Sequence, residues 1–214
     1  MSESSLSRRA ALALPAAFTA AALLPQAARA QTLTGAARDT AIADVTRAVN
    51  AVTRLQGRFS QTDPDGTVVT GQFWLQRPGK LRFEYDAPSP LLMVSDGSTV
   101  AVQDRRLNSV DRFPLRSTPL WFLLKERVDL ATEVSVAEAV RRDGKLYLTM
   151  RDRAREAEGQ LTVVFGERDR SLEEWTVRDG QNRSTRVRLV TSSVPARIDP
   201  RLFILRDPPS RRKR

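Results

Sequence analysis

Residues Gly71 to Tyr85 read GQFWLQRPGKLRFEY, two apolar-rich segments on either side of Arg77-Pro78-Gly79-Lys80. Proline fixes φ at one position of a turn and glycine accepts a positive φ at the next, so Pro78-Gly79 predicts a tight turn. In both arms large apolar residues alternate with other residues, and this period of two is typical of strands with one buried face. The stretch therefore predicts a β-hairpin whose apolar face must be covered, either by protein or by a ligand.

The segments around this hairpin predict a mainly β protein. Upstream, apolar residues recur every three or four positions from Asp39 to Leu55, which predicts an amphipathic helix. Downstream, period-two segments separated by turn signals predict about ten or eleven antiparallel strands, paired in sequence order. One helical turn at Asp199-Pro200-Arg201 is expected before a last strand at Leu202 to Leu205. A sheet of this size curls strongly, so we expect one α+β domain with helices on its concave side.

The first thirty residues are typical of a secretory signal peptide. Ser7-Arg8-Arg9 precedes an uncharged run rich in alanine and leucine, which ends in Ala28-Arg29-Ala30. A basic start, an apolar run and small residues at the cut predict export with cleavage after Ala30. A single membrane anchor is the alternative, although prolines interrupt the run. The expected mature domain covers residues 31–209, and the paired arginines leave both the general secretory and the twin-arginine routes open.

The composition excludes several kinds of chemistry. The chain has no cysteine and no histidine, so disulfides, thiol catalysis and Ser-His-Asp mechanisms are absent. No carboxylate pair has the spacing of an acid-base pair, and no cluster predicts a metal or cofactor site. We therefore expect a protein that is not an enzyme and uses no cofactor.

The charge favours anionic partners. The formal net charge is +10, and the chain ends in Arg211-Arg212-Lys213-Arg214. Lipid headgroups and nucleic acids both attract such a chain. Export argues against nucleic acid, so no nucleic-acid partner is expected. Residues 210–214 are expected to form a disordered basic tail, with transient contact to a membrane surface as the alternative.

An apolar surplus between residues 74 and 124 is the strongest positive signal for function. It includes the short helix predicted from Ser117 to Leu124, which is apolar on nearly all sides and lies either in the core or over an apolar opening. The residues concerned are Trp74, Phe83, Tyr85, Leu92, Phe113, Leu120, Trp121, Phe122 and Leu124. Such a surplus suits a cavity for acyl chains, because burial stabilises by about 0.8 kcal/mol per methylene. Full burial of about sixteen carbons would contribute on the order of 12 kcal/mol, too much for a shuttle unless a closed, ligand-free state competes.

Arg77 is the candidate for holding that closed state. A guanidinium at the end of a strand can donate to several main-chain carbonyls of a facing helix. It would then fasten a lid through contacts that a ligand must break. The alternative is a surface arginine that stabilises its own turn.

Motifs along the chain resemble the periplasmic outer-membrane lipoprotein carrier family (LolA-like). They are, in order, Phe59-Ser60-Gln61-Thr62, the run Gly71-x-Phe-Trp-Leu-x-Arg-Pro, Val94-Ser95-Asp96-Gly97 and Thr118-Pro119-Leu120. They follow the export signal and the amphipathic helix and span nearly all of the mature chain. The arginine-rich end after Pro209 is not part of the family pattern, and residues 125–160 match only in strand rhythm.

The resemblance implies an unclosed antiparallel β-barrel lidded by helices around a cavity for lipoprotein acyl chains. It places the family's gate arginine on Arg77, positions near the cavity mouth on Leu81 and Phe83, and the lid helix on Leu120 to Leu124. It also implies two partners: an ATP-driven lipoprotein-releasing complex at the inner membrane and a lipoprotein receptor at the outer membrane. We expect a monomeric periplasmic carrier. The alternatives are a carrier of another amphiphile, such as a glycolipid, and a binding or sensing module for envelope stress.

Overall fold

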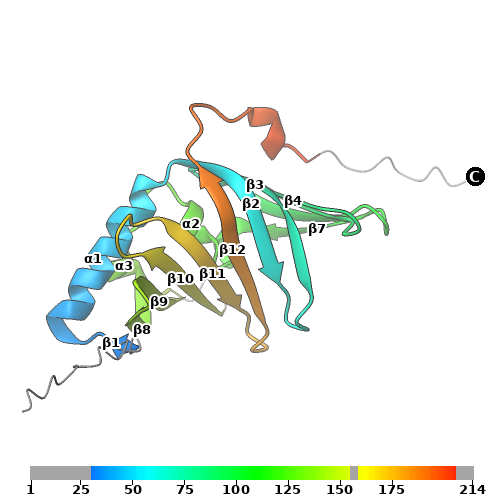
Figure 1. The fold of residues 1–214 in the computed structure, drawn as a ribbon. Helices are drawn as coiled ribbons and strands as arrows, with labels where there is room; N and C mark the ends of the chain where they lie inside the picture. Colours follow the sequence, from blue (N-terminus) through cyan, green and yellow to red (C-terminus); the bar gives the residue numbers. More distant parts are fainter. Residues whose placement is uncertain (1–29, 155–158, 206–214) are drawn as a thin grey trace, which may run out of the picture.

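The computed structural model describes residues 30–154 and 159–205 (Figure 1). The predicted signal peptide up to Arg29 and the predicted tail at 210–214 lie outside the described residues. The described part contains one curled antiparallel sheet with short helical segments on its concave side, so the predicted class, an unclosed barrel that is mainly β, is confirmed. In this part of the chain no helix is both long enough and apolar enough to cross a membrane.

Twelve strands make up the sheet within the described residues. In chain order they are β1 (Gln31–Thr32), β2 (Arg54–Thr62), β3 (Val68–Gln76), β4 (Lys80–Tyr85), β5 (Leu91–Asp96), β6 (Thr99–Asp104), β7 (Ser109–Pro114), β8 (Val134–Arg142), β9 (Lys145–Asp152), β10 (Gln160–Gly166), β11 (Leu172–Arg178) and β12 (Ser184–Ser193). Their order across the sheet is β1-β8-β9-β10-β11-β12-β2-β3-β4-β5-β6-β7. The helical segments are α1 (Gly35–Ala51), the 3-10 turn η1 (Leu115–Ser117), α2 (Trp121–Leu124), α3 (Leu130–Glu133) and the 3-10 turn η2 (Pro200–Phe203).

The topology explains why the helices lie where they do. Strands β2–β7 and β8–β12 each form a meander, and the two meanders join through the antiparallel pair β2–β12. Two connections must therefore cross the sheet: α1 leads from β1 at one edge to β2 in the middle, and residues 115–133 lead from β7 at one edge to β8 near the other. Both connections bury apolar side chains in the main core. We call residues 35–51 and 115–133 together the lid.

The structure differs from the sequence-based prediction in several places, beginning with twelve strands in the described residues where about ten or eleven were predicted. Pairing in sequence order holds within each meander, but β7 and β8 do not pair, because the apolar lid segment between them spans the concave face. The helix predicted from Asp39 to Leu55 runs over Gly35–Ala51, and Leu55 instead lies in β2. The helical turn near Pro200 is present, but residues 204 and 205 form no strand.

The main core lies between the sheet and the lid. Partners in register along one row of the concave face are Leu55, Leu75, Leu81, Ser95, Val100 and Phe113. Beside this row, aromatic rings pack edge to face: the centroids of Phe59 and Phe83 are 4.5 Å apart, and those of Phe83 and Trp175 are 6.0 Å apart. Such pairs stabilise beyond their buried area. The predicted cover for the apolar face of the hairpin is therefore supplied by protein in this conformation.

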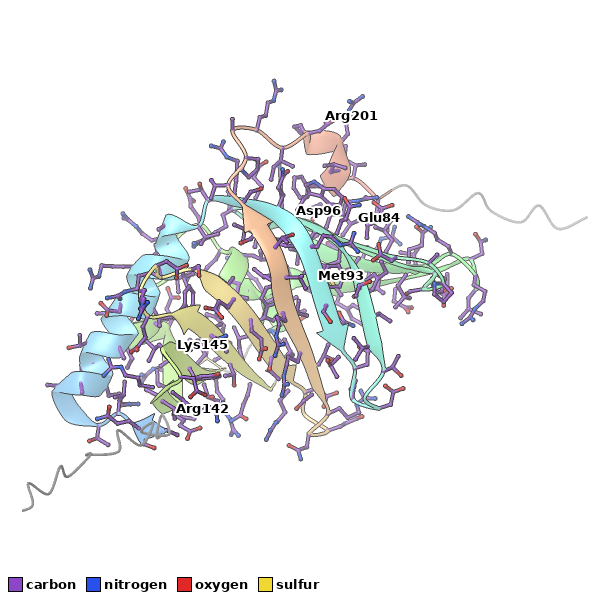
Figure 2. The ribbon with its side chains drawn as sticks, viewed as in Figure 1. Glu84, Met93, Asp96, Arg142, Lys145 and Arg201 are labelled. Carbon is purple, nitrogen blue, oxygen red and sulfur yellow. The ribbon has the colours of Figure 1, made fainter. Side chains whose placement is uncertain are left out.

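A second, smaller core lies on the convex face. Residues 194–205 follow β12 and cross the outside of β4 and β5, where Ile198 and Phe203 are buried. The strand residues buried beneath them are Leu92, Val94 and Ala101. Figure 2 shows Glu84 and Asp96 near this C-terminal segment, which carries Arg201. Arg82 Nη1 donates to Leu202 O at 3.2 Å and fastens the segment to β4.

Candidate functional site

The turn between β3 and β4 lies directly against the lid. Its conformation needs glycine at position 79, where φ is +73° and a Cβ atom would come within 2.4 Å of the Gly97 main chain. The Gly79 amide donates to Leu124 O at 2.6 Å, and Ser95 Oγ donates to Gly79 O at 2.7 Å. Ser95 is fully buried. The turn is thereby fixed both to β5 and to the end of α2.

Arg77 projects from this turn into the seam between the two parts of the lid. Its Nε donates to Lys125 O at 2.8 Å, and its Nη2 donates to the same oxygen at 2.5 Å and to Glu126 O at 3.2 Å. Its Nη1 donates to Val49 O near the end of α1. A weaker contact of 3.3 Å joins Nη2 to Asn50 Oδ1. One side chain of the hairpin therefore bonds both α1 and the linker after α2, residues 125–129.

All these acceptors are neutral carbonyl oxygens, which sets this arginine apart from an ion-paired one. Burial lowers the pKa of Arg77 from its ordinary value of 12.5, because a desolvated guanidinium loses water that the carbonyls only partly replace. Its ordinary value is so high that the group stays charged at neutral pH. The latch consequently consists of charge-assisted hydrogen bonds to the ends of main-chain segments.

Most of the predicted cavity residues gather under the lid. Leu81, Phe83 and Tyr85 on β4 are buried in the concave face, and Phe122 and Leu124 of α2 are buried against the same core. Half-buried Leu120 and Trp121 pack at its margin. Phe113 also faces the concave side, as the partner of Val100, but it is 49% exposed on the edge strand β7.

Two of the predicted cavity residues, Trp74 and Leu92, lie on the wrong face. Register pairs Trp74 with Arg82, and Leu92 with Glu84, so both point to the convex side. Trp74 is half-buried there, and Leu92 is buried by the second core. Alternation along β3 already separates Trp74 from Phe73, but the cover over Leu92 comes from residues more than 100 positions later.

The concave face is filled by side chains in this conformation. Clefts flank the lid at its margins, among them one of about 500 Å³ between α1, α3 and β8 and one of about 430 Å³ between α2, α3 and the end of β9. An acyl chain could therefore reach the core only if the lid moves. The bonds of Arg77 are among those that such a movement must break.

Sequence reasoning missed the acceptors of this latch. Val49, Lys125 and Glu126 take part through main-chain oxygens, which any residue type would supply, so no sequence signal marks them. Asn50 takes part through its side chain. The only available signal was a polar residue beside the apolar stripe of α1, next to Val49.

Comparison with known proteins gives the same family as the motifs. A family model described as "Outer membrane lipoprotein carrier protein LolA" matches residues 50–206, more than half of the chain. An outer-membrane lipoprotein carrier protein of Alkalilimnicola ehrlichii is 41% identical over 73 residues, which are 32% of this chain and 34% of that protein. The corresponding protein of Chromohalobacter salexigens is 29% identical over 201 residues, covering 90% of this chain and 91% of that protein.

Two solved structures are similar to this chain at low identity. A putative outer membrane lipoprotein-sorting protein domain from Vibrio parahaemolyticus has a TM-score of 0.47 at 9% identity, covering 76% of this chain and 94% of that chain. The MucA/MucB complex of Pseudomonas aeruginosa has a TM-score of 0.44 at 13% identity, covering 77% of this chain and 60% of that chain. By its family-model match over residues 50–206, the chain belongs to the LolA family of outer membrane lipoprotein carrier proteins.

Proposed function

We propose that this chain is a monomeric periplasmic carrier that holds the acyl chains of a lipoprotein between the lid and the concave face. It would accept cargo from an ATP-driven releasing complex at the inner membrane and deliver it to a receptor at the outer membrane. The observation that carries the proposal is the Arg77 latch, which closes the lid over a continuous apolar surface through exchangeable hydrogen bonds. Membership of the carrier family supports a lipoprotein as the cargo.

The filled interior fits this role energetically. An acyl chain of about sixteen carbons would gain on the order of 12 kcal/mol if it moved from water into an empty apolar cavity. Here the lid side chains already occupy the apolar face, so loading exchanges one set of buried groups for another. The net gain is then the difference between the two states, reduced by the cost of breaking the latch. Such a carrier holds its cargo firmly in water and still releases it to a receptor that offers another apolar surface.

The position of β1 is compatible with the proposed cleavage. The first described strand begins at Gln31, directly after the predicted cleavage site, and pairs with Arg141 on β8. Cleavage after Ala30 would therefore leave the sheet intact. Intact-mass measurement of the protein recovered from the periplasm is expected to give a chain that starts at Gln31. A mass that retains residues 1–30 would contradict the cleaved signal.

Co-purification of cargo tests the proposed function. The carrier would be expressed with a triacylated lipoprotein or, as a matched control, with the same lipoprotein whose acylated cysteine is replaced by serine. We expect one acylated lipoprotein per carrier and none of the control, measured by mass spectrometry of the purified complex and its extracted lipids. Equal capture of both forms would favour a protein-binding or sensing module, and recovery of lipid without protein would favour a glycolipid carrier.

A further inference from the structure

Asn50 makes a contact that the Arg77 latch does not require. It is the second-last residue of α1, and its side chain pairs with the main chain of Val128, between α2 and α3. Asn50 Nδ2 donates to Val128 O at 2.8 Å, and the Val128 amide donates to Asn50 Oδ1 at 3.0 Å. The Asn50 carboxamide thus satisfies both the N–H and the C=O group of Val128, as a neighbouring strand would.

This pair is well placed to resist water. Val128 is only 2% exposed, and its side chain belongs to the main core. Buried main-chain N–H and C=O groups are costly to leave without partners. If Asn50 moved away, both groups of Val128 would lose a bond at once. The contact should therefore break less readily than a single surface hydrogen bond.

Arg77 and Asn50 join the hairpin, α1 and the linker 125–129 in different ways. Arg77 ties the hairpin to α1 through Val49 O and ties the hairpin to the linker through Lys125 O. Asn50 ties α1 to the linker, and its bond to the hairpin is the weaker contact of 3.3 Å from Arg77 Nη2. Loss of the Arg77 bonds would weaken the attachment of both lid parts to the hairpin, where the bond from the Gly79 amide to Leu124 O remains, yet it would leave the two lid parts attached to each other through Asn50.

We infer that Asn50 is a positioning residue that keeps α1 and the linker 125–129 together, so that the lid opens as one body. This inference rests on the proposed function, in which the lid moves to admit an acyl chain. A joined lid has two arrangements, closed and open, and few partly open ones. It would therefore expose the apolar face only when the whole lid is exchanged for cargo.

Hydrogen exchange of two amides in the cargo-free protein separates the two kinds of contact. The Gly79 amide, bonded to Leu124 O, reports contact between hairpin and lid, and the Val128 amide reports the tie within the lid. In Arg77→Leu we expect exchange at Gly79 to rise about tenfold or more, whereas exchange at Val128 stays within about threefold of the wild type. In Asn50→Leu we expect exchange at Val128 to rise about tenfold or more, whereas exchange at Gly79 stays within about threefold of the wild type.

Matched variants distinguish the tie from a general effect on α1. Thr46→Val removes a hydroxyl that donates to Ile42 O within the same helix, and it should change neither amide. Asn50→Asp retains the acceptor for the Val128 amide but replaces the Nδ2 donor with an oxygen that repels Val128 O, so protection at Val128 should be intermediate between Asn50→Leu and the wild type. Should Asn50→Leu fail to fold, Asn50→Ala takes its place in the same measurement.

The outcomes decide the inference and the proposed function separately. Unchanged exchange at Val128 in Asn50→Leu, or equal acceleration of both amides in Arg77→Leu, would overturn the tie. Loading the wild type with a triacylated lipopeptide should accelerate Gly79 and leave Val128 protected; loss of protection at Val128 would also overturn it. Failure of the wild type to bind the lipopeptide at all would count against the carrier function and leave the comparison in the cargo-free protein to decide the role of Asn50.

Discussion

The two faces of the β3–β4 hairpin are both covered, but the covers are attached differently. On the concave side Arg77 bonds neutral main-chain oxygens at the ends of lid segments. On the convex side Arg82 bonds Leu202 O and also pairs with Glu84 at 2.9 Å. The convex cover buries two large anchors, Ile198 and Phe203, and Arg82 of β4, which holds it, has a carboxylate partner of its own. The concave cover also buries large side chains, such as Phe122 and Leu124, and is fastened by Arg77, whose side-chain bonds all end on the lid.

This difference indicates which cover can lift. The lid's hydrogen bonds to Arg77 can be exchanged for water, and an acyl chain can cover the apolar surface that the lid exposes when it moves. An anchor such as Phe203 cannot leave without exposing its own apolar surface and that of Val94 below it. We therefore expect the C-terminal segment to remain attached while the lid opens. The following predictions test that contrast.

Removal of the convex anchor should give the largest change in stability. Phe203→Ala deletes a side chain that is 2% exposed and should lower the free energy of unfolding by about 3–5 kcal/mol, measured by urea denaturation. Ile204→Ala is the matched control, because that neighbour is 61% exposed and its loss should cost less than about 0.5 kcal/mol. Lipopeptide release from the folded Phe203→Ala protein should match the wild type. Altered release would contradict the view that the convex cover is static.

Removal of the concave latch should give the largest change in release. Arg77→Leu leaves the apolar face intact, so loading persists, but it weakens the closed state that must displace the cargo. Since hydrogen bonds to charged groups contribute about 1.5–3 kcal/mol, transfer to a receptor or to vesicles should slow about ten- to hundredfold. A fluorescent triacylated lipopeptide would report the rate. Arg82→Leu changes the same residue type on the other face and should leave the rate unchanged; equal slowing in both variants would refute the contrast.

Local patterns predicted the elements of this fold better than their order. Period two located the hairpin arms and most strands to within a few residues, because alternation reflects a sheet with one face in the core. The pairing of β2 with β12 was not predictable from short connections, because it joins residues about 130 positions apart. The same distance explains Leu92, which is buried as expected but by a segment that no local pattern assigns to it.

The candidate site, like the fold, was predictable from local patterns only in part. The position of Arg77 at a turn beside a strand end, together with the family motif, predicted contact with carbonyls of a facing segment. The identity of those carbonyls depended on where α1 ends, and the helix ends four residues earlier than the apolar stripe suggested. Asn50 lies at that end. Its pairing with Val128, 78 residues later, follows only from the tertiary structure.

Tyr85 provides a smaller test, based on pH. Burial raises the pKa of Tyr85 from 10.0 to about 12, with the charge of Asp63 acting in the same direction. The folded state therefore favours the neutral phenol, so its contribution to stability is complete below pH 10 and is lost as the pH rises from 10 to 12. At pH 11 the wild type should have lost about 1.4 kcal/mol relative to its value at pH 9. Tyr85→Phe, which cannot ionise, should lack this part of the decline in urea denaturation; identical curves would place Tyr85 in contact with water.

The smallest expected effect is on lipopeptide affinity, and it compares one side chain on each face of the sheet. Phe113 is half-exposed on the concave face of the edge strand β7, and Trp74 is half-buried on the convex face. Phe113→Ala removes apolar surface that an acyl chain would cover, so lipopeptide affinity in equilibrium titration should fall about threefold to tenfold. Trp74→Ala removes a larger side chain and should change the affinity less than about twofold, because cargo on the concave side never touches it. A greater loss of affinity in Trp74→Ala than in Phe113→Ala would place the cargo on the convex face. The cover that must move would then be the C-terminal segment.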